Sequence, residues 1–295
     1  MQYHNSSSAN ITSNSLGNQI ASTVMGLCFA LGIPGNIMTV FFILRHCKKD
    51  NFSLHLMLNL AASDILLLMT VPLWIYNLLN GWTLGSAFCK VLFTVGFIGV
   101  NSSVFTVTLM SVQRYVVVLH RDQWAKLGRK GERTLLLCVW VLACVLSIQN
   151  VLTADTMKKE SKLKCSRLTR SVEERLAILV LEFLLVFVVP FSIIVLCYCR
   201  LHTKVLKSVF GRKLRLTKLM TRIVVIFLIF SCPINLLYPV EIVSLSLKTF
   251  NPHVSENLHK FYLSCINAAS GLIYINSCVN PLLYAFAFKK LFEGT

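Results

Sequence analysis

The chain alternates long apolar segments with short polar ones, and seven of the apolar segments are long enough to cross a membrane. Crossing a hydrocarbon core of about 30 Å takes roughly 20 helical residues. The segments cover residues 19–44, 53–79, 86–119, 133–152, 175–199, 220–245 and 258–286. The pattern predicts an all-α membrane protein, a bundle of seven transmembrane helices within residues 19–288. Residues 1–18 would form a polar tail, and residues 289–295 would begin a short cytoplasmic amphipathic helix.

The third segment is predicted to be the central helix of the bundle. No formal charge occurs from Val91 through Gln113, a helical length of roughly 34 Å. Hydroxyl side chains nevertheless recur within it, at Ser102, Ser103, Thr106, Thr108 and Ser111. Neighbouring helices and the carbonyls one turn earlier can satisfy such groups, whereas lipid cannot.

Composition supports a membrane protein and argues against a soluble domain. Hydrophobic residues make up 55% of the chain, charged residues make up 14%, and the mean hydropathy is +0.68. The formal net charge of +17 arises largely from short loops between apolar segments, so it does not indicate a nucleic-acid-binding surface.

The distribution of Lys and Arg predicts the orientation. They concentrate in the first, third and fifth connections and after the last span, which places these parts in the cytosol. The N-terminus would then be extracellular, in a multi-pass plasma-membrane protein. Asn5 and Asn10 begin glycosylation sequons, which suits this orientation. The basic stretch 201–218 would contact anionic lipid headgroups or an acidic cytosolic partner.

Polar residues within the spans are candidates for function. Asp64 lies in the middle of the second span, where an isolated carboxylate is costly. Residues at a similar expected depth could join it in holding a sodium ion: Ser103, Asn276, Ser277, Asn280 and Asn36. The alternative is a protonated Asp64 hydrogen-bonded to Asn36 and Asn280. Apart from this possible sodium ion, no cofactor is expected.

The motifs of the spans resemble, as a set, those of the rhodopsin-like (class A) G-protein-coupled receptors. They are Gly35-Asn36, Leu60-Ala-Ala-Ser-Asp64, Cys89, Arg114-Tyr115, Trp140, Pro190 with Tyr198, Phe227 with Pro233, and Asn280-Pro281-Leu-Leu-Tyr284. Each motif is weakly specific alone, but at least one falls in each of the seven spans and their order agrees with the family.

This resemblance implies a receptor with a Cys89–Cys165 disulfide and an Arg114 that meets a heterotrimeric G protein on activation. The G protein would be of the inhibitory type, and arrestin would be a further partner. Residues implied in coupling and activation are Arg114, Tyr115, Tyr198, Phe227, Pro233, Pro281 and Tyr284.

Two positions depart from the family pattern. The usual acid before the arginine is Gln113, so the Asp–Arg pair that restrains the resting state is replaced by a neutral hydrogen bond at most. We expect raised basal signalling. The usual tryptophan of the sixth span is Ser231, so Phe227 or Phe230 would carry the packing change.

Overall similarity is greatest to leukotriene B4 receptor-like and other chemoattractant receptors, which implies an anionic hydroxy fatty acid as ligand. Glu182 would accept its hydroxyl and Arg175 would bind its carboxylate. An apolar trough would hold the chain, and the pocket residues are Glu182, Arg175, Phe93, Phe97, Phe183, Ile234 and Asn235. Alternatively, Glu182 is a structural partner of Asn150 or Gln149.

The alternative ligand is a chemokine or another peptide. The basic outer stretch 158–170 argues against a basic chemokine and favours an anion, although it could also be a solvated loop. An enzyme is not expected because the chain lacks HExxH, GxSxG and Walker motifs. A transporter is not expected either, since the sequence shows no internal repeat.

Overall fold

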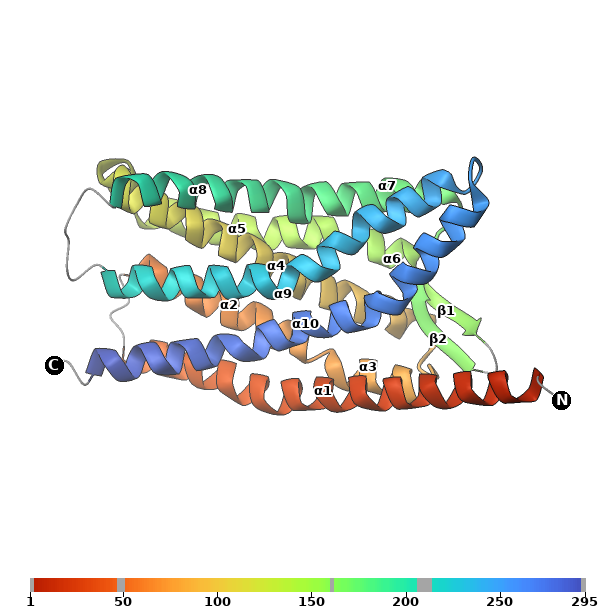
Figure 1. Cartoon of the computed structure of the whole chain (residues 1–295). Helices are drawn as coiled ribbons and strands as arrows, with labels where there is room; N and C mark the ends of the chain where they lie inside the picture. The colour runs from red at the N-terminus through yellow and green to blue at the C-terminus, as the bar shows by residue number, and fades with distance from the viewer. Residues whose placement is uncertain (1–2, 47–50, 160–161, 206–213, 293–295) are drawn as a thin grey trace.

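The computed structural model describes residues 3–46, 51–159, 162–205 and 214–292, which form a long helical bundle with one β-hairpin at one end (Figure 1). The elements, in chain order, are α1 (Tyr3–His46), α2 (Phe52–Leu68), α3 (Val71–Leu79), α4 (Gly85–Leu119), α5 (Arg121–Ser147), α6 (Gln149–Thr153), β1 (Ala154–Lys159), β2 (Lys162–Arg167), α7 (Val172–Glu182), the π-helix η1 (Phe183–Val188), α8 (Val189–Val205), α9 (Leu214–Leu247) and α10 (Pro252–Phe292).

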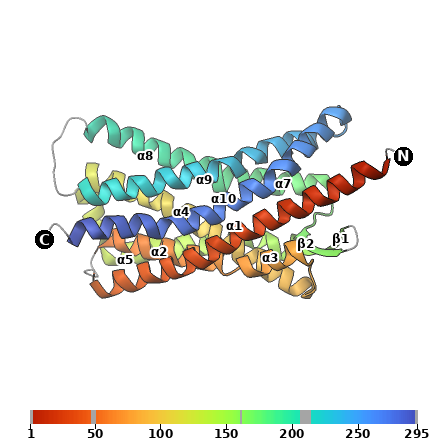
Figure 2. The same cartoon turned by 60° about the horizontal axis from the view of Figure 1, so that its bottom comes forward.

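These elements confirm the seven-helix bundle. Within the described residues, six segments are long and apolar enough to cross a membrane by themselves: Gly17–Arg45, Phe52–Leu79, Gly85–Leu119, Arg121–Thr153, Val172–Leu201 and Leu219–Leu247. The seventh helix, α10, is richer in serine and asparagine. It packs between α9 and α1, as both views of the bundle show (Figures 1 and 2).

Three spans are built from more than one helix, and proline explains two of the interruptions; the fourth span divides at Ile148, between α5 and α6. The second span breaks between α2 and α3, just before Pro72. In a regular helix the ring of Pro72 would clash with the carbonyl of Leu68, four residues earlier. The hydroxyl of Thr70 donates to the Leu67 carbonyl at 2.6 Å across this break. The fifth span contains a π-helical turn, η1, ahead of Pro190.

Helical structure extends beyond the predicted limits at several places. The expected polar tail is helical from Tyr3, because each residue added to an existing helix gains a backbone hydrogen bond. The connection after α4 is also helical, and Gly128 at φ 61° separates it from the fourth span within α5. The last described residues, up to Phe292, continue α10.

Some predicted features lie outside the described part of the chain. The basic connection 201–218 includes residues 206–213, which the structure does not describe. Residues 293–295 of the expected cytoplasmic helix, and the side chains of the sequon residues Asn5 and Asn10, also lie outside it.

Helix α4 is central, as its hydroxyl pattern predicts. It contacts α2, α5, α8, α9 and the hairpin, and most of its side chains from Asn101 to Arg114 are buried. Its hydroxyls bond to preceding carbonyls, with Thr106 donating to Ser102 at 2.6 Å and Thr108 to Val104 at 2.8 Å. The largest apolar cluster includes Leu56, Met57, Leu60, Val107, Met110, Met220, Ile223 and Phe227.

Candidate functional site

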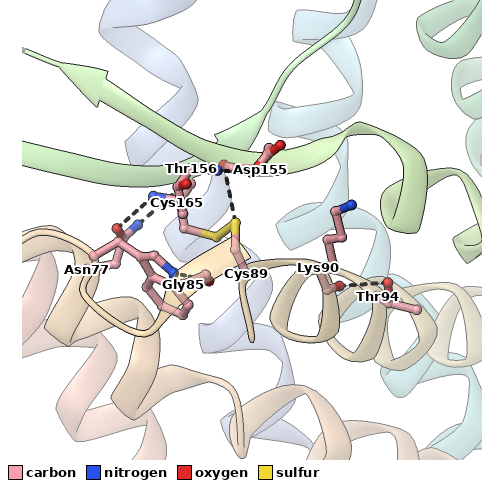
Figure 3. The surroundings of a disulfide bond; sticks show 9 residues. Asn77, Gly85, Cys89, Lys90, Thr94, Asp155, Thr156 and Cys165 are labelled. Carbon is pink, nitrogen blue, oxygen red and sulfur yellow. Dashed lines mark hydrogen bonds between the residues drawn. A yellow bond between two sulfur atoms is a disulfide. The ribbon is translucent and has the colours of Figure 1, made fainter. Parts of the chain in front are cut away.

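The β-hairpin covers the end of the bundle where α1 begins, here called the disulfide end (Figure 1). Cys89 of α4 and Cys165 of β2 form the disulfide that the family resemblance implies (Figure 3). The Cys165 amide donates to the side-chain oxygen of Asn77 at 3.1 Å, and the Asn77 amide donates back to the Cys165 carbonyl at 3.4 Å. The Trp82 amide donates to the Leu163 carbonyl at 2.7 Å. These bonds fix strand β2 above α3 and α4.

A cavity of about 860 Å³ runs from this end into the middle of the bundle. Five of the seven residues predicted to bind ligand line it: Phe93, Phe97, Glu182, Ile234 and Asn235. The other two, Arg175 and Phe183, do not line it. The cavity also reaches Phe227 and Ser231, the residue at the position where the family has tryptophan.

Glu182 is buried, and both of its carboxylate oxygens are hydrogen-bonded. The Arg167 guanidinium donates to Oε1 at 2.9 Å and to Oε2 at 3.1 Å. Gln149 also donates to Oε1, and the Tyr238 hydroxyl donates to Oε2 at 3.3 Å. The predicted structural partner Gln149 is therefore present, whereas the side chain of Asn150 donates to the Ser147 carbonyl. The ion-pair partner is Arg167, which the sequence analysis missed.

Arg175 lies in a separate cluster, here called the three-helix clamp, which consists of Arg175 of α7, Glu241 of α9 and His259 of α10. The Glu241 carboxylate is fully buried. It accepts from Arg175 Nη2 at 2.6 Å, and His259 Nδ1 lies 3.0 Å from its other oxygen. The predicted use of Arg175 as the carboxylate partner of a ligand is therefore not supported, since Arg175 already pairs with Glu241.

The polar core around Asp64 forms much as the sequence suggests. Asp64 is fully buried and accepts from the Asn280 amide at 2.7 Å and from the Ser103 hydroxyl at 3.3 Å. Asn36 does not bond to Asp64, because its amide donates to the carbonyls of Gly32 and Ser277, both at 3.0 Å.

This core also fits a sodium ion. The side-chain oxygens of Asn36, Asn276 and Asn280 are buried and have no hydrogen-bond partner among the described residues. Carboxylate, amide and hydroxyl oxygens are the donors that hard cations prefer. Ser103, Asn276 and Ser277 line the inner part of the cavity, so an ion could reach them from it.

At the other end of α4, here called the Arg114 end, a single serine holds two side chains. Arg114 is buried, and its Nη2 donates to the Ser53 hydroxyl at 2.6 Å. The Gln113 amide donates to the same hydroxyl at 3.2 Å. The neutral hydrogen bonds that stand in for the family's acid–arginine pair are therefore made to Ser53 of α2, a residue that the sequence analysis missed.

The remaining predicted activation residues lie on the helices around Arg114. The ring of Tyr115 lies 5.7 Å from that of His120, while Tyr284 is buried and Tyr198 packs against the main apolar cluster. Pro233 lies inside α9 and Pro281 inside α10. A Cβ at Gly35 would come within 2.8 Å of Pro281, so α1 and α10 can approach this closely only with glycine there.

Comparison with known proteins agrees with this geometry. Residues 35–284 match the family model described as 7 transmembrane receptor (rhodopsin family). C-C chemokine receptor type 7 of Homo sapiens is 29% identical over 273 residues, which cover 90% of this chain and 70% of that receptor. C-C chemokine receptor type 8 of Mus musculus is 30% identical, with 89% and 74% covered. Apelin receptor A of Danio rerio is also 30% identical, with 88% and 76% covered.

Proposed function

Because this chain belongs to the rhodopsin family of seven-transmembrane receptors, it is a multi-pass G-protein-coupled receptor, and we propose that its ligand is a peptide or small protein of the chemokine class. The observation that carries the proposal is the similarity to chemokine receptors over about nine-tenths of the chain. A cavity of about 860 Å³ that reaches the disulfide end suits the insertion of a peptide terminus.

The proposal replaces the lipid mediator that the sequence analysis preferred. That preference depended on Glu182 and Arg175 acting together on one ligand. Glu182 pairs with Arg167 and Arg175 pairs with Glu241, so the two residues belong to different clusters. The relatives named above are chemokine and apelin receptors, which supports a peptide over a leukotriene-like fatty acid.

We propose that the disulfide end, with the N-terminus, faces the outside of the cell. Disulfides form in the oxidising secretory pathway and are rare in the cytosol. Strand β2, which carries Cys165 of the disulfide, and the start of α1 lie at the same end of the bundle (Figure 1). Asn5 and Asn10 would then be available for glycosylation, and the basic connections would lie in the cytosol as the positive-inside rule requires.

At the cytosolic end, Arg114 would engage a heterotrimeric G protein of the inhibitory type, and arrestin would bind the same activated face. In the structure Arg114 donates to the Ser53 hydroxyl of α2, and we assign this contact to the resting state. Activation would be a shift of population toward a packing in which α9 moves and Arg114 regroups with Tyr198 and Tyr284.

The polar core would hold a sodium ion through Asp64, Ser103, Asn276, Ser277 and Asn280. The ion would supply a positive charge that compensates the buried carboxylate and favours the resting packing of α2, α4 and α10. Sodium titration of agonist affinity, with Asp64→Asn as the variant that removes the charge, tests this assignment.

Suppression of cyclic AMP in cells expressing the chain tests the proposed function. A panel of chemokines and peptides is compared with a panel of hydroxylated fatty acids, with and without pertussis toxin. Toxin-sensitive suppression by at least one chemokine or peptide is expected. Suppression by fatty acids alone would return the ligand assignment to the lipid class, and resistance to the toxin would reject the inhibitory G protein.

A further inference from the structure

Arg167 is the last residue of β2, and among the described residues of the hairpin it is the one that lines the cavity. The guanidinium carbon lies over the Phe97 ring, 5.1 Å from its centre, within the range of a cation–π contact. Two hydrogen bonds from the guanidinium to the two carboxylate oxygens of Glu182 restrain the same side chain further. Arg167 is thus a charged side chain held in one orientation by two neighbours, both of which line the same cavity.

The two charges of this pair are not equally available. Within the described residues, each of the two carboxylate oxygens of Glu182 accepts two hydrogen bonds, and the side chain is 5% exposed. Arg167 has five N–H donors, of which the bonds recorded in the described part of the chain use two, and its side chain is 22% exposed. Arg167, which lines the cavity, therefore retains unused donors, whereas each oxygen of Glu182 already accepts two hydrogen bonds.

This asymmetry determines which ligand charge the pair can accept. A cationic ligand group would have to displace Arg167, Gln149 or Tyr238 from Glu182. An anionic group needs only the unused N–H donors of Arg167, and a carboxylate matches the guanidinium geometry. Arg167 and Glu182 are the only Lys, Arg, Asp or Glu side chains among the described residues that line the cavity, so no competing charge offers a second docking point.

We propose that Arg167 is the specificity-determining residue of the cavity and that it binds a carboxylate of the ligand. The inference rests on the proposed receptor function, in which this cavity binds the agonist. The carboxylate belongs to the C-terminus or an acidic side chain of a peptide, or to a fatty acid; both sources present the same chemistry to Arg167. Glu182 is then a positioning residue that holds the guanidinium toward the cavity.

The test uses two pairs of small probes on the full chain in lipid nanodiscs. Each pair contains an acid and its amide: N-acetyl-Leu-Phe with N-acetyl-Leu-Phe-amide, and octanoate with octanamide. Dissociation constants are measured by saturation-transfer NMR in the native chain, in Glu182→Gln and in Arg167→Gln/Glu182→Gln. The control, Arg175→Gln/Glu241→Gln, neutralises an ion pair that does not line the cavity.

The acid is expected to bind at least threefold more tightly than its amide in the native chain, for at least one probe pair. Glu182→Gln should increase this preference to about tenfold or more, because the glutamine oxygen can still accept a hydrogen bond from Arg167, while the negative charge that repels a ligand carboxylate is removed. The double variant Arg167→Gln/Glu182→Gln should abolish the preference, and the control should retain it. A purely structural role for the pair predicts the opposite for Glu182→Gln, namely weaker binding of acid and amide alike.

Equal or undetectable responses to acid and amide in the native chain would overturn the proposal, as would a preference that survives the double variant. The two arms separate this failure from a failure of the proposed function. A preference shown only by the dipeptide supports a peptide ligand, whereas a preference shown only by octanoate retains the role of Arg167 and contradicts the peptide assignment.

Discussion

At the scale of single residues, the side chains that matter most each join two elements of the fold through one polar group. Ser53 of α2 holds both Gln113 and Arg114 of α4. Arg167 joins the hairpin to Glu182 of α7. Sequence patterns identify that Arg114 and Glu182 are unusual for a membrane interior, because charge is costly there. They do not identify the partners, since these depend on the rotation of neighbouring helices and on where a loop is held.

The substitution Ser53→Ala should raise ligand-free signalling severalfold. It removes the hydroxyl that accepts from Arg114 at 2.6 Å, and a hydrogen bond to a charged group contributes about 1.5–3 kcal/mol. Ligand-free suppression of cyclic AMP, normalised to surface expression, measures the effect. Ser53→Thr retains the hydroxyl and serves as the control; an equal rise in Thr and Ala variants would contradict the role of this bond.

The substitution Gln113→Asp should act in the other direction. An acid beside Arg114 adds a charge–charge attraction in the resting packing, where the native chain has only the shared bond to Ser53. Ligand-free signalling should therefore fall below that of the native chain in the same assay. If Gln113→Asp leaves basal signalling unchanged, the departure from the family acid does not set the basal level.

At the scale of elements, hydrophobic length predicted the seven spans well, and proline explains the interruptions of the second and fifth spans. The errors lie at helix ends and between helices. Arg175 was assigned to the ligand because it lies seven residues before Glu182 on a similar face, yet seven residues are about 10 Å of helix. At that distance its side chain reaches Glu241 of α9, while Arg167 from the hairpin occupies the position beside Glu182. The Cys89–Cys165 pairing could have located Arg167 near the cavity, because the disulfide holds Cys165 against α4 and Arg167 follows Cys165 by two residues.

The three-helix clamp should contribute measurably to stability. Removing one partner of a buried ion pair costs about 3–5 kcal/mol, but Arg175 and His259 are 38% and 39% exposed, so we expect about 2 kcal/mol for Glu241→Ala. Thermal unfolding in nanodiscs measures the loss. The control is Glu256→Gln, which removes an exposed pair with Lys260 within α10 and should change the melting temperature little. Equal shifts for both variants would argue against the clamp.

The disulfide should fix the hairpin that carries Arg167. Cys89→Ser/Cys165→Ser opens a loop that spans a sequence separation of 76 residues, and such crosslinks typically contribute 2–4 kcal/mol. We expect lower thermal stability and loss of the acid preference in the probe assay. Cys138→Ser/Cys144→Ser removes two exposed free cysteines and should preserve both properties.

At the scale of the whole molecule, span length and composition predicted the bundle, hydroxyl side chains in an uncharged span predicted its central helix, and motifs resembling the rhodopsin-like family predicted the receptor class. The ligand could not be predicted in the same way. Its recognition depends on which charges remain unpaired once seven helices and a hairpin meet, and the pairing of Glu182 with Arg167 became visible only in three dimensions. The similarity to chemokine receptors then shifts the assignment from a lipid to a peptide.

The central claim is that this chain converts the binding of a chemokine-class ligand into nucleotide exchange on an inhibitory G protein. The most direct measurement is the rate of guanine nucleotide exchange on a purified inhibitory heterotrimer with the chain in nanodiscs, during titration with chemokines and peptides. We predict a saturable acceleration by at least one of them, absent from discs without the chain. No acceleration by any chemokine or peptide, alongside acceleration by a hydroxylated fatty acid, would contradict the account.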